Sequence, residues 1–292
     1  MSIPQLKDYP LPATLPENKV RWQLEPQRCA LLIHDMQDYF LSFWDRESAM
    51  IRQVIANLAA LRQRCHQLNI PVFYTAQPGQ QSEKDRALLN DMWGPGLNRT
   101  PEQQRIVPTL APAPQDCVLV KWRYSAFQRS DLEARLNALQ RDQLLIGGIY
   151  AHIGCLTTAT DAFMRDIQPF MVADALADFS QQEHEMALRY TAGRSGRVLT
   201  TACALDELVA PPQAWHREAL LALLAPMLDE DTQQLADDDD LLDYGLDSVR
   251  IMSLASRWRK EGHELDFVAL VKQPTLAAWL RLLNGRRQYD VV

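Results

Sequence analysis

Short runs that are apolar at every position, separated by longer amphipathic stretches, limit the fold of the N-terminal part of this chain more than any other feature. Such strands are typical of parallel sheets covered by helices on both faces, because neither face meets water. Right-handed crossovers place the connecting helices on the sheet. The pattern therefore predicts a three-layer α/β fold. We expect strands at 30–33, 72–75, 118–120, 144–146, 169–172 and 198–199, and helices at about 48–68, from Ser130, and at about 182–190.

The chain changes character near residue 209, which indicates a domain boundary. Residues 1–28 hold five prolines and predict an extended arm that lies over the first domain. The sequence Val-Ala-Pro-Pro at 209–212 is typical of a linker. We therefore expect an α/β domain over 1–210, arm included, and a second domain over 213–292. The second domain is predicted to be a small four-helix bundle, with helices at about 215–228, from 248, at 267–271 and at 275–283.

Charge and cysteine content exclude several classes of protein. The formal net charge is −7, which argues against non-specific binding to nucleic acid. Residues 213–292 hold 9 Lys and Arg against 14 Asp and Glu, a balance of −5, so the second domain suits basic protein partners. No apolar run is long enough to span a membrane, and the N-terminus lacks a secretory pattern. Five cysteines without a close pair predict a reduced, cytoplasmic protein.

Ser248 lies where an acidic loop meets the predicted start of a helix. Gly245 permits a tight turn, and the Asp247 carboxylate can accept from the free N–H groups of the first helical turn. The Ser248 hydroxyl is therefore presented to other proteins. No histidine or lysine stands near it to activate it as a nucleophile, so we expect a serine that is modified rather than one that reacts. An ordinary N-capped helix is the alternative.

The stretch Asp-Tyr-Gly-Leu-Asp-Ser at 243–248 resembles the phosphopantetheine-attachment motif of acyl, peptidyl and aryl carrier proteins. The shared features are the acidic approach, the Gly-x-Asp-Ser core and the apolar residue after the serine. The resemblance implies that Ser248 carries covalent 4′-phosphopantetheine. It also implies that Val249, Met252 and Phe267 contact partner proteins; the alternative is that they belong to the bundle core.

The acidic loop before Ser248 is also a candidate metal site. Mg²⁺ prefers oxygen ligands from carboxylates, backbone carbonyls and water. Asp229, Gly245 and Asp247 offer such oxygens, which predicts a Mg²⁺ ion in this loop.

Polar residues follow the predicted strands at the ends where ligands bind in open α/β sheets. Asp35 follows the first strand, Gln77 the second and Lys121 the third. Tyr150 and Gly154 follow the fourth. Together they offer a carboxylate, an amide, an ammonium, a phenol and a glycine next to a helix N-terminus. Such a set can bind and protonate an anionic small molecule.

The same strand-end residues resemble those of the isochorismatase-like hydrolases, whose members carry an Asp, a Lys and a nucleophilic Cys. Asp35 and Lys121 match the first two. The nucleophile position, counted from Gly148, falls on Gly154, and Cys155 is one residue late. A slip of one residue turns a helical side chain by about 100°, so we expect Cys155 in the helix packing. A nicotinamidase-like amidase that uses Cys155 stays open as an alternative.

Five segments resemble the isochorismatase subgroup more closely, namely 34–40, 74–78, 86–96, 121–127 and 150–155. That subgroup hydrolyses the vinyl ether of isochorismate to 2,3-dihydro-2,3-dihydroxybenzoate and pyruvate. The reaction needs a general acid but no protein nucleophile, because water captures the ion formed when the methylene carbon is protonated. The resemblance implies Asp35 as the acid, Lys121 as its partner or as a counter-ion for a substrate carboxylate, and Gln77, Arg86, Tyr150 and Gly154 as substrate contacts.

Other residues of these segments have supporting roles in this interpretation. Phe40 and Trp93 are expected to wall the pocket and to exclude water. His34 and His152 suggest metal ligands, but the carboxylate–histidine spacing of a metal site is missing. We interpret both histidines as structural or as supports behind the residues that contact the substrate.

The proposed site residues also have plain structural interpretations. Asp35 can be a helix cap, Lys121 a solvated surface lysine and Tyr150 a core residue. Arg86 lies in a charged helical stretch, which is usually a solvated face. The combination of the Asp, the Lys and a Gly at the Cys position favours the site over these readings.

The two resemblances span the whole chain, which looks like the bifunctional isochorismatase/aryl carrier proteins of catechol siderophore biosynthesis, of the enterobactin type. They imply that a phosphopantetheinyl transferase modifies Ser248 and that an adenylating ligase loads the arm with 2,3-dihydroxybenzoate. A condensing nonribosomal synthetase then receives the aryl group. Hydrolases resembling the first domain commonly self-associate, so a homo-oligomer is expected. A catalytically silent scaffold with a working carrier domain is the second alternative.

Overall fold

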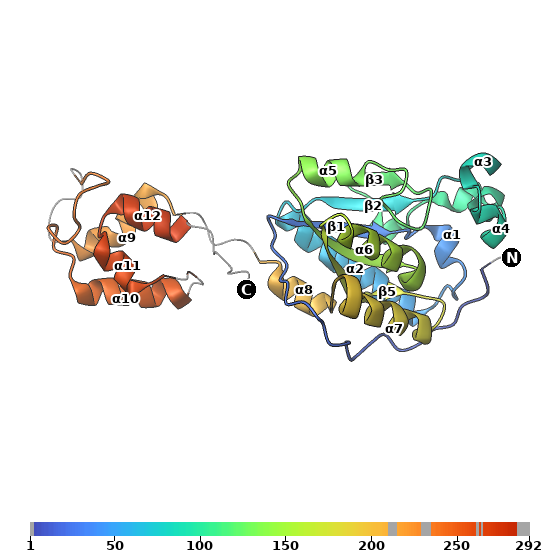
Figure 1. The fold of residues 1–292 in the computed structure, drawn as a ribbon, viewed down its shortest axis with the longest axis horizontal. Coiled ribbons are helices and arrows are strands. Elements are labelled where there is room, and N and C mark those ends of the chain that lie inside the picture. The colour runs from blue at the N-terminus through green and yellow to red at the C-terminus, as the bar shows by residue number, and fades with distance from the viewer. Residues whose placement is uncertain (1–2, 210–214, 229–234, 261–262, 264, 285–292) are drawn as a thin grey trace. The chain divides into compact units, whose positions relative to one another are not determined.

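The computed structural model describes residues 3–209, 215–228, 235–260, 263 and 265–284. The chain divides into two compact units, residues 1–209 and 210–292, and each is considered by itself (Figure 1). The predicted linker at 209–212 lies largely outside the described residues. Within the described parts, no helix has the length and apolar character needed to cross a lipid bilayer.

The first unit is built on a six-stranded sheet in which every strand pair is parallel. The strand order is β3-β2-β1-β4-β5-β6, so the chain begins in the middle of the sheet and fills one half before the other. β1 and β4 are buried at every position, which explains their continuous apolar sequences. All six predicted strands are present, as β1 Cys29–His34, β2 Val72–Ala76, β3 Cys117–Val120, β4 Gln143–Ile149, β5 Gln168–Ala177 and β6 Arg197–Leu199.

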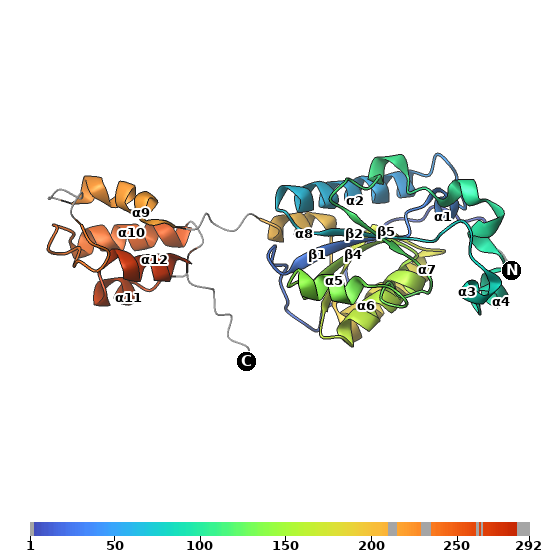
Figure 2. The ribbon, with the colours of Figure 1, turned by 90° about the horizontal axis from the view of Figure 1, so that it is seen from above.

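Helices cover both faces of this sheet, which confirms the predicted three-layer α/β fold (Figure 2). One apolar cluster joins the sheet to α2 and α8, and a second joins it to α5, α6 and α7. The covering helices are α2 Ala49–Gln67, α5 Leu132–Ala138, α6 Leu156–Phe163, α7 Gln181–Tyr190 and α8 Thr201–Glu207.

Helix α2 shows how the sequence directs these elements. Its N-cap residue, Ser48, accepts a hydrogen bond from the Ile51 N–H, and Asn69 beyond its end has a positive φ of 54°. Its apolar residues recur at spacings of three and four, so they form one stripe that faces the sheet. The buried members are Met50, Ile51, Val54, Leu58, Leu61 and Cys65.

Short helices and turns fill the connections that surround the carboxyl ends of the central strands. The π-helical turn η4 leads from β4 directly into α6, and a second such turn, η5, follows α7. Three short helices and three 3₁₀ turns follow β1 and β2. Their bounds are α1 Asp38–Leu41, α3 Glu83–Arg86, α4 Leu89–Trp93, η1 Gly96–Arg99, η2 Pro101–Gln104 and η3 Pro108–Leu110, with η4 at Ala151–Cys155 and η5 at Thr191–Ser195.

The N-terminal arm lies over the body of the first unit, as predicted. The Asn18 side chain pairs with both backbone groups of Val198, at 2.7 and 2.8 Å. The Tyr9 hydroxyl accepts from the Asp178 N–H at 2.7 Å and lies 3.0 Å from His184 Nδ1. These contacts join residues about 170 apart in sequence, so they fix the arm across α7 and β6.

The second unit is the predicted helical bundle. Trp258 and Trp279 meet edge to face at its centre, with ring centroids 5.7 Å apart. Both are fully buried, and the Trp279 indole N–H donates to Leu270 O at 3.0 Å. The first predicted helix is shorter than expected because Pro226 follows it in a 3₁₀ turn, η6. The helices are α9 Arg217–Leu224, α10 Ser248–Lys260, α11 Phe267–Lys272 and α12 Leu276–Asn284, with η6 at Ala225–Met227.

Candidate functional site

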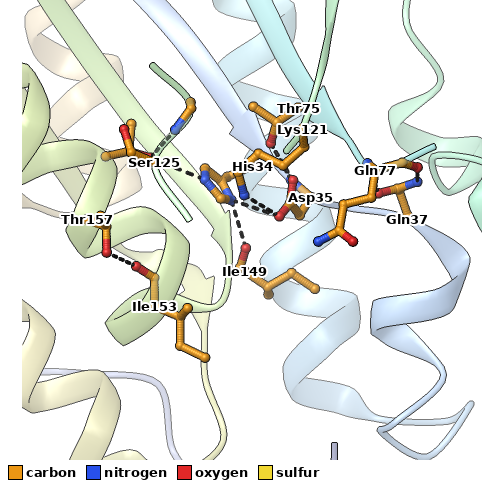
Figure 3. Close-up of polar contacts among 12 residues, drawn as sticks. His34, Asp35, Gln37, Thr75, Gln77, Lys121, Ser125, Ile149, Ile153 and Thr157 are labelled. Atoms are coloured by element: carbon orange, nitrogen blue, oxygen red, sulfur yellow. Dashed lines mark hydrogen bonds and ion pairs between the residues drawn. The ribbon is translucent and has the colours of Figure 1, made fainter. Parts of the chain in front are cut away.

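The carboxyl ends of three neighbouring strands bring three polar side chains into contact (Figure 3). Asp35 follows β1, Thr75 lies in β2 and Lys121 follows β3. Lys121 Nζ donates to Asp35 Oδ2 at 2.7 Å, and Thr75 Oγ1 donates to Asp35 Oδ1 at 2.5 Å. Asp35 is 6% exposed and Lys121 only 4%. Lys121 is therefore not a solvated surface lysine.

These contacts hold Asp35 as a carboxylate. Burial alone would raise the pKa of the Asp35 carboxyl, but the Lys121 ammonium and the Thr75 hydroxyl lower it below its usual range. Asp35 also has a φ of +51°, in the left-handed region that non-glycine residues adopt only at a cost. Such strain is common at functional sites. The sequence does not show whether burial or the Lys121 charge has the larger effect on the pKa of Asp35. In the structure the lowering effects prevail, so the ionised form is favoured.

His34, the residue before Asp35, is a neutral imidazole inside the fold. Its Nδ1–H donates to Ile149 O at 2.9 Å, and its Nε2 lies 3.3 Å from Thr158 Oγ1. Burial and the Lys121 charge lower the pKa of His34 to about 4. Both ring nitrogens have partners within the protein, which agrees with the structural interpretation.

A pocket opens beside this cluster, with about 590 Å³ of empty space that includes its open mouth. It lies where the strand order reverses between β1 and β4, the place where open α/β sheets bind ligands. Phe40 and Trp93 form part of its wall, as predicted. The pocket brings together all six residues expected at the site: Asp35, Gln77, Arg86, Lys121, Tyr150 and Gly154.

Arg86 gives this pocket a second buried cation. It is 4% exposed, whereas its neighbours Glu83 and Lys84 are exposed. Its Nε donates to Gly94 O at 2.6 Å and its Nη1 to Gln81 Oε1 at 3.3 Å. No carboxylate among the described residues pairs with it, and burial lowers the pKa of the guanidinium. The reading of Arg86 as a solvated face is wrong, and its free charge suits a carboxylate ligand.

Gln77 is positioned by a second glutamine. The buried Gln37 side chain accepts from the Gln77 N–H at 2.7 Å and donates to Gln77 O at 2.8 Å (Figure 3). It also donates to Gln104 O at 2.6 Å, which ties three connections together. The backbone of Gln77 is thus fixed, and its amide side chain lines the pocket.

Tyr150 lines the pocket, and its hydroxyl is hydrogen-bonded within the protein. The hydroxyl donates to Phe40 O at 3.0 Å. The ring stacks on Trp44, with centroids 5.7 Å apart, and meets the edge of Phe179 at 4.7 Å. Burial raises the pKa of this phenol well above its usual value, so it stays protonated. Toward a ligand Tyr150 therefore offers a ring face and an acceptor oxygen.

Cys155 points away from the pocket, as the one-residue slip predicts. It is fully buried in the apolar cluster shared by the sheet, α5, α6 and α7. Burial raises the pKa of its thiol well above the usual value, so the thiolate is absent at neutral pH. The residue that faces the pocket is Gly154, which has no side chain. The amidase alternative thus lacks its nucleophile.

His152 lies in a cluster that sequence spacing does not reveal. Its Nδ1 lies 2.5 Å from Asp178 Oδ1, and its Nε2 lies 3.9 Å from Glu183 Oε1. Asp178 also accepts from the backbone N–H groups of His152 and Phe179. This carboxylate is therefore occupied by N–H donors. The cluster orients His152 beside Phe179, which lines the pocket.

Ser248 is exposed at the first position of α10, as predicted. Asp247 Oδ1 accepts from the Arg250 N–H at 2.8 Å and so caps the helix. Gly245 has a φ of +93°, which makes the turn before the serine available only to glycine without strain. Val249 and Met252 are 75% and 58% exposed beside it, so neither belongs to the bundle core.

The structure gives no support to Mg²⁺ in the acidic loop. Arg250 Nη1 donates to Gly245 O at 2.8 Å, and Arg250 Nε lies 3.9 Å from Asp247 Oδ2. A guanidinium thus faces both of these predicted oxygen ligands. The third, Asp229, lies outside the described residues.

Several functional positions were not predicted from the sequence. Thr75 contacts Asp35 directly, and a lone hydroxyl at the end of an apolar strand is the signal that could have singled it out. Gln37 lies in the segment 34–40 after the first strand, but its bridging of distant connections has no local sequence signal. Ile3 of the arm and Phe179 also line the pocket, and only the tertiary fold brings them there. Arg123 lines it too, and its place just after the third predicted strand is the signal that could have singled it out.

Comparisons with known proteins agree with this geometry. The isochorismatase domain model matches residues 29–203, and the phosphopantetheine attachment site model matches residues 218–283. The chain is 62% identical over 286 residues to enterobactin synthase component B of Escherichia coli K12, covering 97% of this chain and 99% of that protein. It is 46% identical over 303 residues to the isochorismatase of Bacillus subtilis 168, covering 99% and 97% respectively.

Solved structures support the fold of the first unit. An isochorismatase family protein from Burkholderia thailandensis superposes with a TM-score of 0.58 at 24% identity, covering 67% of this chain and 99% of that one. A cysteine hydrolase from Pseudomonas syringae gives a TM-score of 0.59 at 23% identity, covering 69% and 98%. The predicted pairing of a hydrolase with a carrier is confirmed by the two domain matches. The chain belongs to the isochorismatase family and joins its isochorismatase domain to a phosphopantetheine carrier domain.

Proposed function

We propose that residues 1–210 hydrolyse isochorismate to 2,3-dihydro-2,3-dihydroxybenzoate and pyruvate. We propose also that residues 213–292 carry 2,3-dihydroxybenzoate as a phosphopantetheine thioester for siderophore assembly. The observation that carries the first half is a pocket with one buried acid and two buried cations, of which only Lys121 is paired. Isochorismate has two carboxylates, so its charge complements this pocket.

Acid catalysis requires a protonated Asp35, whereas the free enzyme holds this residue as a carboxylate. Substrate binding supplies the change. One carboxylate pairs with Arg86, which has no counter-ion among the described residues. The other competes with Asp35 for Lys121. Asp35 then loses part of its stabilising charge and gains an anionic neighbour, and both changes raise its pKa. Asp35 takes up a proton as the substrate binds and becomes the general acid.

The reaction then needs only Asp35 and water. Asp35 gives its proton to the terminal methylene carbon of the vinyl ether, which becomes a methyl group, and the adjacent carbon becomes an oxocarbenium ion. Water adds to that carbon and passes a proton to the Asp35 carboxylate. The hydroxyl of the resulting hemiketal gives up its proton as the bond to the ring oxygen breaks. The ring oxygen takes up a proton, so the ring alcohol leaves and pyruvate forms. No covalent enzyme intermediate occurs.

The remaining pocket residues hold the substrate in place. We assign to the Gln77 amide a hydrogen bond to the substrate, because Gln37 fixes its backbone. The Tyr150 ring packs against the substrate. Because its hydroxyl donates to Phe40 O, the hydroxyl oxygen can only accept a hydrogen bond from the substrate. Gly154 lets the substrate approach the backbone closely, because it places no side chain in the pocket.

The direct test is pyruvate release from isochorismate by the purified full-length chain, followed with a coupled dehydrogenase and by chromatography of the ring product. We expect the two products in equal amounts. Absence of pyruvate would leave the chain as a catalytically silent scaffold, the second alternative.

The carrier half rests on the exposed Ser248 and its apolar surroundings. We propose that a phosphopantetheinyl transferase modifies it, that an adenylating ligase loads the arm and that a condensing synthetase accepts the aryl group. Val249 and Met252 offer these proteins an exposed apolar contact beside the attachment point. Phe267 packs against the bundle core and is a weaker candidate. Incubation with coenzyme A and a transferase should add the mass of the arm to the intact chain.

We further propose a reducing, cytoplasmic setting and self-association of the hydrolase domain. All five cysteines are free, as expected for a reducing compartment. Phe163, Met164 and Tyr190 expose 46%, 69% and 46% of their surface on helices α6 and α7 or just beyond α6. Light scattering on the full-length chain tests self-association, and a monomer at micromolar concentration would contradict it.

A further inference from the structure

His34 and Gly154 approach each other so closely that residue 154 has no room for a side chain. A Cβ atom at residue 154 would lie 2.2 Å from His34 Cε1 and 3.0 Å from each ring nitrogen. Real Cβ atoms do not approach other heavy atoms within 3.0 Å. Any residue other than glycine at this position would therefore require the imidazole or the turn after β4 to move.

The imidazole has little freedom to move. Its two nitrogens are held by Ile149 O and Thr158 Oγ1, at 2.9 and 3.3 Å, and its exposed fraction is 0%. Its backbone is fixed within β1, where it pairs with Gly148 of β4. Gly148 has a φ of +121°, and a Cβ there would meet His34 O at 2.2 Å. The strand pair therefore holds the imidazole firmly against Gly154.

The space that His34 fills has chemical importance. Residue 154 lies on the wall of the pocket that contains Asp35 and Lys121. A serine or cysteine at this position would sit beside a carboxylate that can act as its base, which is the arrangement that covalent catalysis needs. Cys155 cannot replace it, because that thiol is buried in the core behind the turn.

We propose that His34 is a specificity-determining residue, whose imidazole occupies the volume of a side chain at residue 154 and so restricts the pocket to acid-catalysed attack by water. The close packing of His34 against residue 154 follows from the distances alone. The reaction that this packing selects rests on the proposed function. His34 takes no part in proton transfer. It acts by excluding a nucleophile from the wall beside Asp35.

A double-mutant cycle in the full-length chain tests the packing. Gly154→Ala is made alone and together with His34→Asn, which keeps a donor for Ile149 O and removes the ring carbon that would clash. We expect Gly154→Ala to lower kcat/KM for pyruvate release at least about tenfold in the presence of His34, and to lower the thermal midpoint of the hydrolase domain. Both losses should shrink when Asn stands at position 34. Equal losses in the two backgrounds would overturn the proposal.

A second experiment tests the selection itself. Gly154→Cys is made with and without His34→Asn, and each protein is treated with iodoacetamide and mapped by peptide mass spectrometry. We expect the introduced thiol to react at least about tenfold faster in the His34→Asn background, because only there can it enter the pocket beside Asp35. Cys155, which is fully buried in the unmodified chain, is the internal control and should stay unlabelled. Equal alkylation rates would contradict the proposal.

The two experiments separate this inference from the proposed function. Alkylation rates and thermal midpoints require no hydrolysis of isochorismate. If the unmodified chain released no pyruvate, the hydrolase function would fall, and these two readouts would still decide whether His34 controls access to position 154.

Discussion

Asp35 and Ser248 carry the two oxygens on which the proposed activities depend, and their surroundings are opposite. Asp35 is buried, paired with Lys121, hydrogen-bonded to Thr75 and strained in its backbone. Ser248 is exposed at the start of a helix. Its neighbours are the capping residue Asp247 and an apolar surface. The first arrangement lowers the pKa of a carboxyl and limits its contact with water. The second leaves a hydroxyl chemically ordinary and easy to reach.

The contrast shows how one chain can separate hydrolysis from the modification and loading of the carrier serine. A general acid gains from burial, because neighbouring charges then control its protonation. An attachment serine gains from exposure, because the transferase supplies the chemistry and must reach the hydroxyl. Changes in one region should therefore leave the activity of the other intact.

Ser248→Ala should have the largest effect, a complete loss of phosphopantetheine addition in the presence of coenzyme A and a transferase. Intact-protein mass spectrometry measures it. Pyruvate release from the same protein should be unchanged, because the serine belongs to the other compact unit. A mass gain that persists in this variant would refute Ser248 as the attachment site.

Arg86→Ala should lower kcat/KM for isochorismate about 10- to 150-fold, the equivalent of about 1.5–3 kcal/mol for a charged hydrogen bond. Arg86→Lys is the matched control and should recover only part of the loss, because lysine lacks the forked geometry. The loss should appear mainly in KM if Arg86 binds substrate and transition state alike. Unchanged kinetics would show that the carboxylate binds elsewhere.

Rising pH should lower kcat/KM for pyruvate release. The pKa of Asp35 in the free enzyme is below its usual range, so near neutrality the free enzyme is ionised there. The productive complex has one more proton, and its formation becomes harder as protons become scarcer, by up to about tenfold per pH unit. Lys121→Gln should move the fall to higher pH, because it removes the charge that lowers the pKa. A rate that increases with pH would contradict Asp35 as the acid.

Cys155→Ala should have the smallest effect, with pyruvate release within about threefold of the unmodified chain and a modest loss of stability from the cavity left in the core. A steady-state assay at saturating isochorismate measures it. Abolished hydrolysis would restore the amidase alternative and would remove the distinction between an acid site and a nucleophile site.

Sequence predicted the fold well where every position of an element shares one environment. β1 and β4 are buried at every position, and this burial gives them the apolar runs at 30–33 and 144–146, which are visible without neighbours. Strand-end positions, together with the family resemblance, brought the six pocket residues to notice. The protonation state of Asp35 was out of reach, because it depends on a partner 86 residues away. The close contact between His34 and Gly154 depends likewise on the register of β1 against β4.

The most direct test of the account measures both activities in one protein, with Asp35→Ala compared with the unmodified full-length chain. Isochorismate is supplied for the hydrolase, and coenzyme A with a transferase for the carrier. We predict that Asp35→Ala lowers pyruvate release about 10²- to 10⁴-fold, while the mass gain at Ser248 proceeds at the same rate. Pyruvate release at an unchanged rate in Asp35→Ala would contradict Asp35 as the general acid.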